Sequence, residues 1–105
     1  MTGYRVDRQK WAGLSLFEQL GNIGSEVGRA FEAKRRGDTI ATRAATQRAL
    51  DLFDATTGQG RLTYPRLKEV LRAREQFVSS IDSSDPGQSL ENYFMQFAIA
   101  ARIKH

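Results

Sequence analysis

One stretch near the N-terminus, residues 14–37 (LSLFEQLGNIGSEVGRAFEAKRRG), constrains the fold more than any other part of the chain. It opens with Ser15 and Glu18, the two ends of a capping box, whose side chains satisfy backbone N–H groups of the first helical turn. A basic run and Gly37 close it in the way helices commonly end. We therefore predict a helix over about 15–36, with an apolar face of five residues at helical spacing: Leu16, Leu20, Ile23, Val27 and Phe31.

Three glycines, Gly21, Gly24 and Gly28, lie at one edge of this apolar arc. Inside a helix each glycine costs about 0.8–1 kcal/mol relative to alanine, so their presence needs a structural reason. Close approach of another backbone is such a reason. The next helical segment has a matching row of small residues, and we predict that the two rows pack together: Ala41, Ala45 and Ala49.

The rest of the chain predicts three more helices, over about 39–56, 64–81 and 87–104. Asp38 is a suitable N-cap for the first of them, and Pro65 suits the first turn of the second. Residues 1–13 show no clear periodicity, and Trp11 is interpreted there as a hydrophobic anchor, with base stacking as the alternative. We predict one all-α domain over 1–105, an up-and-down four-helix bundle with an irregular N-terminal segment.

Arg74 is unusual because it falls at the centre of the apolar stripe of segment 64–81. Its stem could lie along the core while the guanidinium reaches water or one carboxylate. The alternative is a structural buried charge. A buried arginine needs a carboxylate partner, and three are possible: Glu26, Asp51 or Asp54.

The last helical segment is apolar on two sides. One side supplies a core face, and the other carries a second line made of Met95, Ile99 and Ile103. Such a helix is either central in the fold or in contact with another chain. We predict that the second line is an oligomer interface, because exposed apolar patches usually mark contact sites.

Composition excludes several chemistries. The 105-residue chain has no cysteine, and its only histidine is His105. Disulfides, thiolate zinc sites and histidine-based catalysis or metal binding are thereby excluded. The run DATTGQGRLTYPRLKE looks like an EF-hand loop but places Arg66 where the closing glutamate would stand, so we reject calcium binding. We predict no metal, no cofactor and no enzymatic activity.

No stretch approaches the roughly 20 apolar residues of a membrane span, and the first residues lack the pattern of a secretory signal. We therefore expect a cytoplasmic protein without a membrane partner.

The formal charge is +4, and its distribution predicts a function. In an up-and-down bundle the N-terminal segment, the turn near residues 57–61 and the C-terminus meet at one end. This basic end would present a phosphate-binding surface for RNA or DNA, with Tyr4, Trp11 and Tyr64 near enough to interleave. Ordinary solvated charge is the alternative. The basic end consists of Arg5, Arg8, Lys10, Arg61, Arg66, Lys68, Arg102 and Lys104.

The leading hypothesis is a non-catalytic, oligomeric accessory protein that binds nucleic acid through its basic end as part of a larger complex. The alternative is a protein–protein adaptor or regulatory subunit, which would act through the apolar face of the C-terminal helix without contacting nucleic acid.

The runs LSLFEQLGNIGSEVGRAF, ALDLFDAT, RLKEVLRARE and YFMQFAIAAR resemble a group of short bacterial helical proteins of unassigned role. This resemblance implies no activity. In size, charge and four-helix plan the chain is also similar to the accessory variability proteins of diversity-generating retroelements. Those are basic bundles that form a ring-like oligomer and bind a reverse transcriptase and nucleic acid. This second similarity rests on architecture rather than on a sequence motif.

Overall fold

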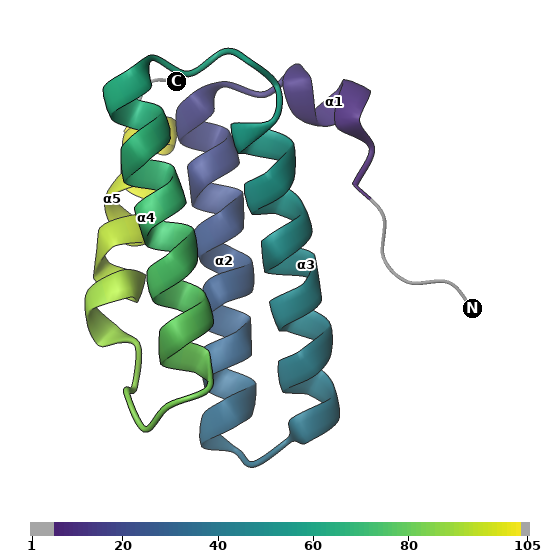
Figure 1. Cartoon of the computed structure of the whole chain (residues 1–105), viewed down its shortest axis with the longest axis vertical. Coiled ribbons are helices and arrows are strands. Elements are labelled where there is room, and N and C mark those ends of the chain that lie inside the picture. The colour runs from purple at the N-terminus through teal and green to yellow at the C-terminus, as the bar shows by residue number, and fades with distance from the viewer. Residues whose placement is uncertain (1–5, 104–105) are drawn as a thin grey trace.

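The computed structural model describes residues 6–103, which form helices joined by loops (Figure 1). The helices are α1 (Arg8–Ala12), α2 (Leu16–Arg35), α3 (Thr39–Thr57), α4 (Tyr64–Ile81) and α5 (Gln88–Ile103). The four long ones run alternately up and down, and no strand occurs in the described range. The predicted all-α bundle is confirmed. None of the helices between residues 6 and 103 is long and apolar enough to span a membrane.

The ends of α2 form as their sequence indicates. The Ser15 hydroxyl accepts the Glu18 N–H at 3.1 Å, and the Glu18 carboxylate accepts the Ser15 N–H at 2.8 Å. At the other end Gly37 takes a φ of +76°, a left-handed conformation that favours glycine. The N–H groups of Gly37 and Asp38 then bond back to Lys34 and Ala33, which is a Schellman motif.

The N-terminal segment is not wholly irregular, so that part of the prediction was wrong. The Asp7 carboxylate caps the five-residue helix α1 by accepting the N–H groups of Gln9 and Lys10. A helix this short shows no detectable period in its sequence. Trp11 is buried, with 7% of its surface exposed, so its interpretation as an anchor is confirmed.

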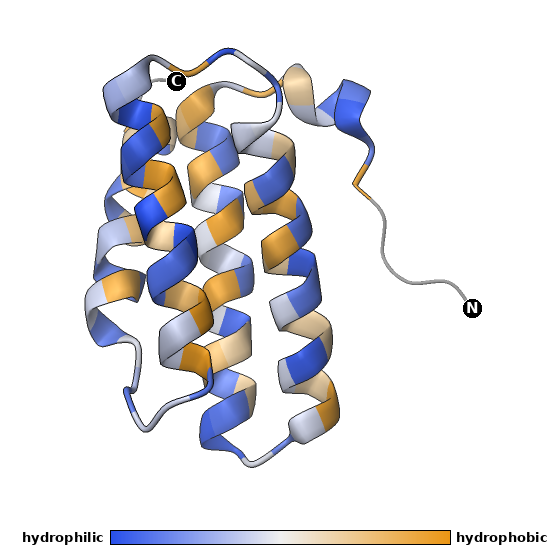
Figure 2. Ribbon diagram, in the orientation of Figure 1, coloured by the Kyte–Doolittle hydropathy of each residue, from blue (hydrophilic) through white to orange (hydrophobic). Residues whose placement is uncertain are grey.

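Four phenylalanines, one from each long helix, form the centre of the core. The rings of Phe31 and Phe77 have centroids 5.9 Å apart, and Phe53 lies 6.2 Å from Phe77 and 5.8 Å from Phe94. Figure 2 shows the apolar residues gathered on the faces that the helices turn toward one another. These buried rings hold the bundle together through apolar burial and edge-to-face contacts.

The glycines of α2 do allow close approach, but to a different helix from the one predicted. A Cβ built on Gly24 would lie 2.4 Å from the Phe94 Cβ, and one on Gly21 would lie 3.2 Å from the Ala98 Cα. Both neighbours belong to α5. The alanines of α3 instead pack on the other flank of α2, where Ala30 and Ala33 are buried. Because small residues line both flanks, α2 lies against α3 and α5 alike.

Arg74 is not a buried charge. Helix α4 turns the small residues Ala73 and Ser80 toward the core, together with Val70 and Phe77. This rotation moves Arg74 to the flank of the buried face, where its side chain is 32% exposed. Its Nε donates to Asp54 at 3.1 Å, so one of the three candidate partners is the actual one. The arrangement matches the interpretation of a stem along the core with a paired head group.

Helix α5 is peripheral rather than central. Leu90, Phe94 and Phe97 are buried, whereas the second apolar line stays exposed. Met95 is 55% exposed, Ile99 45% and Ile103 76%. The alternative of a central helix was therefore wrong, and an unpartnered apolar line runs along the outside of this chain.

Candidate nucleic-acid interface

The basic end is brought together by the fold. Helix α1, the α3–α4 connection, the first turn of α4 and the last turn of α5 all lie at the same end of the bundle (Figure 1). Six of its eight members are in the described range: Arg8, Lys10, Arg61, Arg66, Lys68 and Arg102. Arg5, Lys104 and the aromatic Tyr4 lie outside the described residues.

A buried polar network, which was not predicted from the sequence, holds this end in shape. The Gln19 amide donates to the Trp11 carbonyl at 2.8 Å, while its oxygen accepts from Gln59 at 2.8 Å and from the Thr56 hydroxyl at 3.1 Å. That hydroxyl also accepts the Trp11 indole N–H at 2.9 Å. The network ties α1 and the α3–α4 connection to α2 and α3. A glutamine next to the apolar arc of α2, one turn before Ile23, was the signal available in the sequence.

Two members of the basic end are engaged within the protein. Arg61 donates to the Ala12 carbonyl, which fastens the α3–α4 connection to the end of α1. Arg66 pairs with Glu69 at 2.6 Å and lies over the Phe97 ring, 5.7 Å from its centroid. Tyr93 of α5 donates to the same carboxylate at 2.7 Å. Burial, together with this hydrogen bond, raises the pKa of Tyr93 above its usual value.

The other four described members of the basic end are exposed, and none has an acidic partner within residues 6–103. Within residues 6–103, Arg8, Lys10 and Arg102 make no hydrogen bond or ion pair through their side chains. Lys68 lies 5.8 Å from the centroid of the Tyr64 ring, which is 71% exposed. Trp11, by contrast, is buried and hydrogen-bonded, so it offers no face to a base. Tyr64 is thus the described aromatic of this end that can stack.

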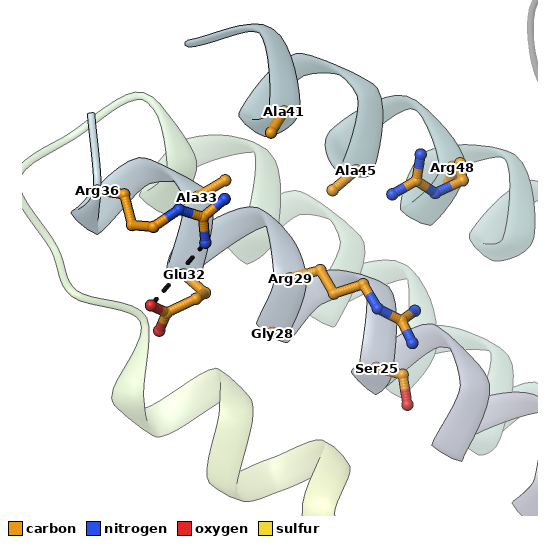
Figure 3. A pocket seen from close by; sticks show the side chains of 9 residues that line it. All are labelled: Ser25, Gly28, Arg29, Glu32, Ala33, Arg36, Ala41, Ala45 and Arg48. Atoms are coloured by element: carbon orange, nitrogen blue, oxygen red, sulfur yellow. Dashed lines mark ion pairs between the residues drawn. The ribbon is translucent and has the colours of Figure 1, made fainter. Parts of the chain in front are cut away.

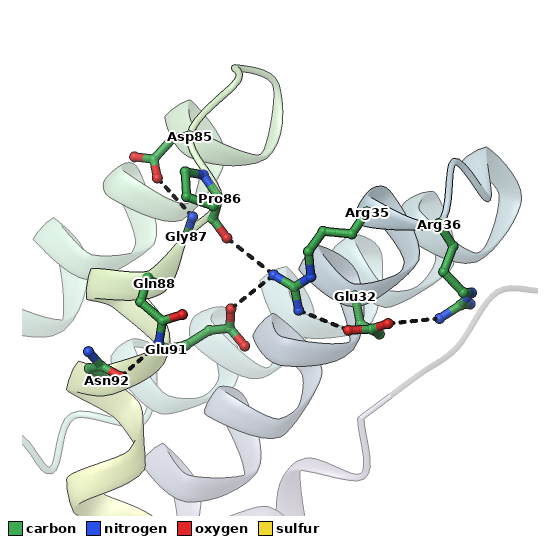
Figure 4. Close-up of polar contacts among 9 residues, drawn as sticks. All are labelled: Glu32, Arg35, Arg36, Asp85, Pro86, Gly87, Gln88, Glu91 and Asn92. Carbon is green, nitrogen blue, oxygen red and sulfur yellow. Dashed lines mark hydrogen bonds and ion pairs between the residues drawn. The ribbon is translucent and has the colours of Figure 1, made fainter.

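The opposite end of the bundle holds a second basic run, in which Lys34 and Arg35 are satisfied internally (Figure 4). The Lys34 ammonium donates to the carbonyl oxygens of Ser80 and Ser83. Arg35 pairs with Glu32 at 2.9 Å and with Glu91 at 3.5 Å, and the hydrogen bond to Glu32 raises the pKa of Arg35. These two residues clamp the α4–α5 loop to α2, whereas Arg36 is held loosely, 4.0 Å from Glu32 and 3.8 Å from Asp38.

A third basic surface lies between α2 and α3, in an open groove of about 510 Å³ (Figure 3). Arg29, Arg36 and Arg48 border it, and small residues form its floor. None of these arginines belongs to a site predicted from the sequence. Their proximity depends on how two helices pack, which no local pattern shows.

Comparison of the chain with protein-family models, curated proteins and solved structures finds no match. Within residues 6–103 no cluster of three histidine, cysteine, aspartate or glutamate side chains is placed to hold a metal ion. The assignment of a function therefore depends on the charged and apolar surfaces of the bundle.

Proposed function

We propose that this protein is a non-catalytic accessory subunit that binds nucleic acid through its basic end. One observation supports this most directly. Both ends of the bundle are basic. At one end Lys34 and Arg35 are held by carbonyls and carboxylates. At the other, four cations lack an acidic partner in the described range: Arg8, Lys10, Lys68 and Arg102. Unpaired arginines and lysines are the groups that neutralise phosphates and release counterions.

The exposed ring of Tyr64 beside Lys68 adds to the proposal. An aromatic face next to a cation is the usual combination in single-strand binding, because bases stack on the ring while the cation contacts the backbone. The network around Gln19 holds α1 and the α3–α4 connection in place, which lowers the ordering cost of binding.

The test is binding of a labelled single-stranded oligonucleotide at several salt concentrations. The double variant Lys68→Gln/Arg102→Gln removes two unpaired cations of the basic end, whereas Arg61 and Arg66 are unsuitable because they support the fold. Losing two phosphate contacts should lower the slope of log K against log salt by about 1.4, at roughly 0.7 per contact for a single strand.

The control is Arg43→Gln/Arg72→Gln, which removes the same charge from exposed positions on α3 and α4 that have no partner in the described range. The control should keep the slope of the unaltered protein. Equal effects of the two double variants would show that binding depends on net charge rather than on the basic end. Absence of binding at low salt would refute the proposal.

The exposed line of Met95, Ile99 and Ile103 favours a second candidate, a protein–protein adaptor. Under this alternative, Ile99→Glu abolishes assembly with a partner chain while Lys68→Gln/Arg102→Gln leaves assembly unchanged. The opposite pattern, with oligonucleotide binding lost only in the latter variant, supports the nucleic-acid proposal.

A further inference from the structure

The outer face of α2 borders two grooves that share residues. Ser25 and Gly28 line the groove between α2 and α3 and also a smaller one of about 220 Å³ between α2 and α5. The smaller groove includes Gly21 and Met95. The two grooves therefore form one continuous surface, three helices wide, on the side of α2 that carries Ser25 and Glu32.

The floor of this surface is built from small side chains. Gly28, Ala33, Ala41 and Ala45 line the larger groove, so an added backbone can come close. Small residues at a helix interface let two backbones come close, and a groove between two helices is a common binding site for a third helix. On the α5 side, Met95 adds an exposed apolar flank.

The rim of the larger groove is cationic and incompletely neutralised. One carboxylate, Glu26, serves two guanidinium groups, at 3.2 Å from Arg29 and 3.1 Å from Arg48. Arg36 lies 4.0 Å from Glu32 and 3.8 Å from Asp38, both at the long limit of an ion pair. In Figure 3 the head groups of Arg36 and Arg48 lie toward opposite ends of the groove and turn toward its middle. Several N–H donors are therefore left for a ligand.

The spacing of these cations fits a helix. Arg29 lies on α2 and Arg36, seven residues on, is its C-cap with helical backbone angles, so they are about 10.5 Å apart along the axis at 1.5 Å per residue. Acidic side chains repeating every seven residues on a facing helix would meet both, as the flanking charges of coiled coils do. A phosphate backbone fits less well, because its charges recur about every 3.4 Å along a strand and some must fall beside Glu26 and Glu32, whereas glutamates seven residues apart can meet the arginines alone.

We propose that this surface docks an acidic amphipathic helix of a partner protein. The apolar side of that helix covers the glycine and alanine floor and Met95, while its carboxylates pair with Arg29, Arg36 and Arg48. This protein-binding surface is separate from the basic end, so the chain can hold a protein and a nucleic acid at once.

The probe is a synthetic helical peptide of about 21 residues, six turns, with leucine and alanine at the core positions of each heptad and glutamate at the flanking ones. A second peptide carries lysine in place of glutamate. Binding is measured by fluorescence anisotropy on the full chain, and backbone N–H shifts in NMR spectra locate the contact. We expect the acidic peptide alone to bind, with shifts centred on Ser25, Gly28 and Arg48.

Two variants test the site. Arg29→Gln/Arg36→Gln should lower the affinity for the acidic peptide by about tenfold or more. Both side chains are over half exposed, so their loss leaves the core intact. Ser25→Tyr should weaken it by filling the shared part of the grooves without changing charge. The matched control Arg43→Gln/Arg72→Gln should bind as the unaltered protein does.

Three results would overturn the proposal. They are absence of acidic-peptide binding, equal binding of the lysine peptide, and equal loss in the control double variant. If Arg29→Gln/Arg36→Gln instead weakens binding of the oligonucleotide and leaves binding of the peptide unchanged, the groove belongs to the nucleic-acid surface and the docking proposal fails. A weakened acidic peptide with an unchanged oligonucleotide affinity supports the docking proposal and shows that its surface is distinct from the basic end.

Discussion

At the scale of single residues, Gln19 is a buried polar side chain whose hydrogen bonds must all be satisfied inside the fold. Its amide is fully buried and joins three separate parts of the chain through Trp11, Thr56 and Gln59. A buried polar network of this kind stabilises only while every member is satisfied. Removing one member leaves the others desolvated without a partner.

We therefore expect Gln19→Leu to lower the free energy of unfolding by about 1–3 kcal/mol per buried group left unsatisfied, although leucine is the more apolar residue. Urea denaturation measures the change. The control is Gln47→Leu, which removes an exposed hydrogen bond to Asp51 on α3 and should cost under about 0.5 kcal/mol. A Gln19 variant as stable as the control would show that the network contributes nothing.

Two glycines of α2 offer a test of opposite signs. Gly24→Ala would place a Cβ 2.4 Å from the Phe94 Cβ, so it should destabilise by about 1–3 kcal/mol through overpacking. Gly28→Ala meets only the Glu91 carboxylate at 3.4 Å and should stabilise by about 0.5–1 kcal/mol through helix propensity. Thermal unfolding compares the two directly. A Gly24→Ala variant as stable as the unaltered protein, or more stable, would contradict the contact of Gly24 with α5.

At the scale of elements, the contact between α4 and α5 depends on polar groups as well as on the core. Tyr93 donates across this contact to Glu69, which also pairs with Arg66. Because the pKa of Tyr93 is raised in the folded protein, the neutral hydroxyl stabilises the fold at every pH below the unfolded value of 10.0. That contribution is lost as the pH rises from there toward the folded pKa.

The expected result is a fall in unfolding free energy above about pH 10 that Tyr93→Phe makes less steep. Urea midpoints between pH 8 and pH 11, taken as the difference between the two proteins, isolate this residue from the lysines that titrate in the same range. Tyr64→Phe, at a largely exposed position, should keep the steepness of the unaltered protein. An equally steep fall in the Tyr93 variant would contradict a role for this hydroxyl.

The helices also show which features of the fold a sequence pattern can predict. The capping box of Ser15 and Glu18 and the left-handed Gly37 were predictable, because each interaction spans only a few residues. The rotation of α4 was not. Its apolar residues alone place Arg74 inward, whereas in the fold the small Ala73 is buried and the Phe77 ring packs near Phe31 and Phe53. Side-chain size at a helix contact decides such rotations, and hydrophobicity alone does not show it.

At the scale of the whole molecule, the basic end and the arginine-bordered groove share no residue. The apolar line of α5 does reach the docking surface, because Met95 also lines the smaller groove between α2 and α5. A partner helix in the grooves and a second copy on the apolar line would therefore compete for Met95.

If the apolar line joins two copies, the mass in solution should be at least twice that of the 11.8 kDa chain. Ile99→Glu should return the protein to a monomer, because it places a charge in the middle of an apolar contact. The control is Leu71→Glu on α4, where leucine is 41% exposed against 45% for Ile99. Light scattering after size-exclusion chromatography measures the mass. A strictly monomeric unaltered protein would refute self-association through this line.

The sequence by itself determined the four long helices, most of their ends and the exposed apolar line of α5, because these follow from caps and periodicity within single segments. The tertiary structure alone decided which helix meets the glycines of α2 and which cations of the basic end remain unpaired. It also decided that Arg29, Arg36 and Arg48 share one groove. Each of these depends on the distance between residues far apart in the chain, and that distance is set by packing rather than by any local pattern.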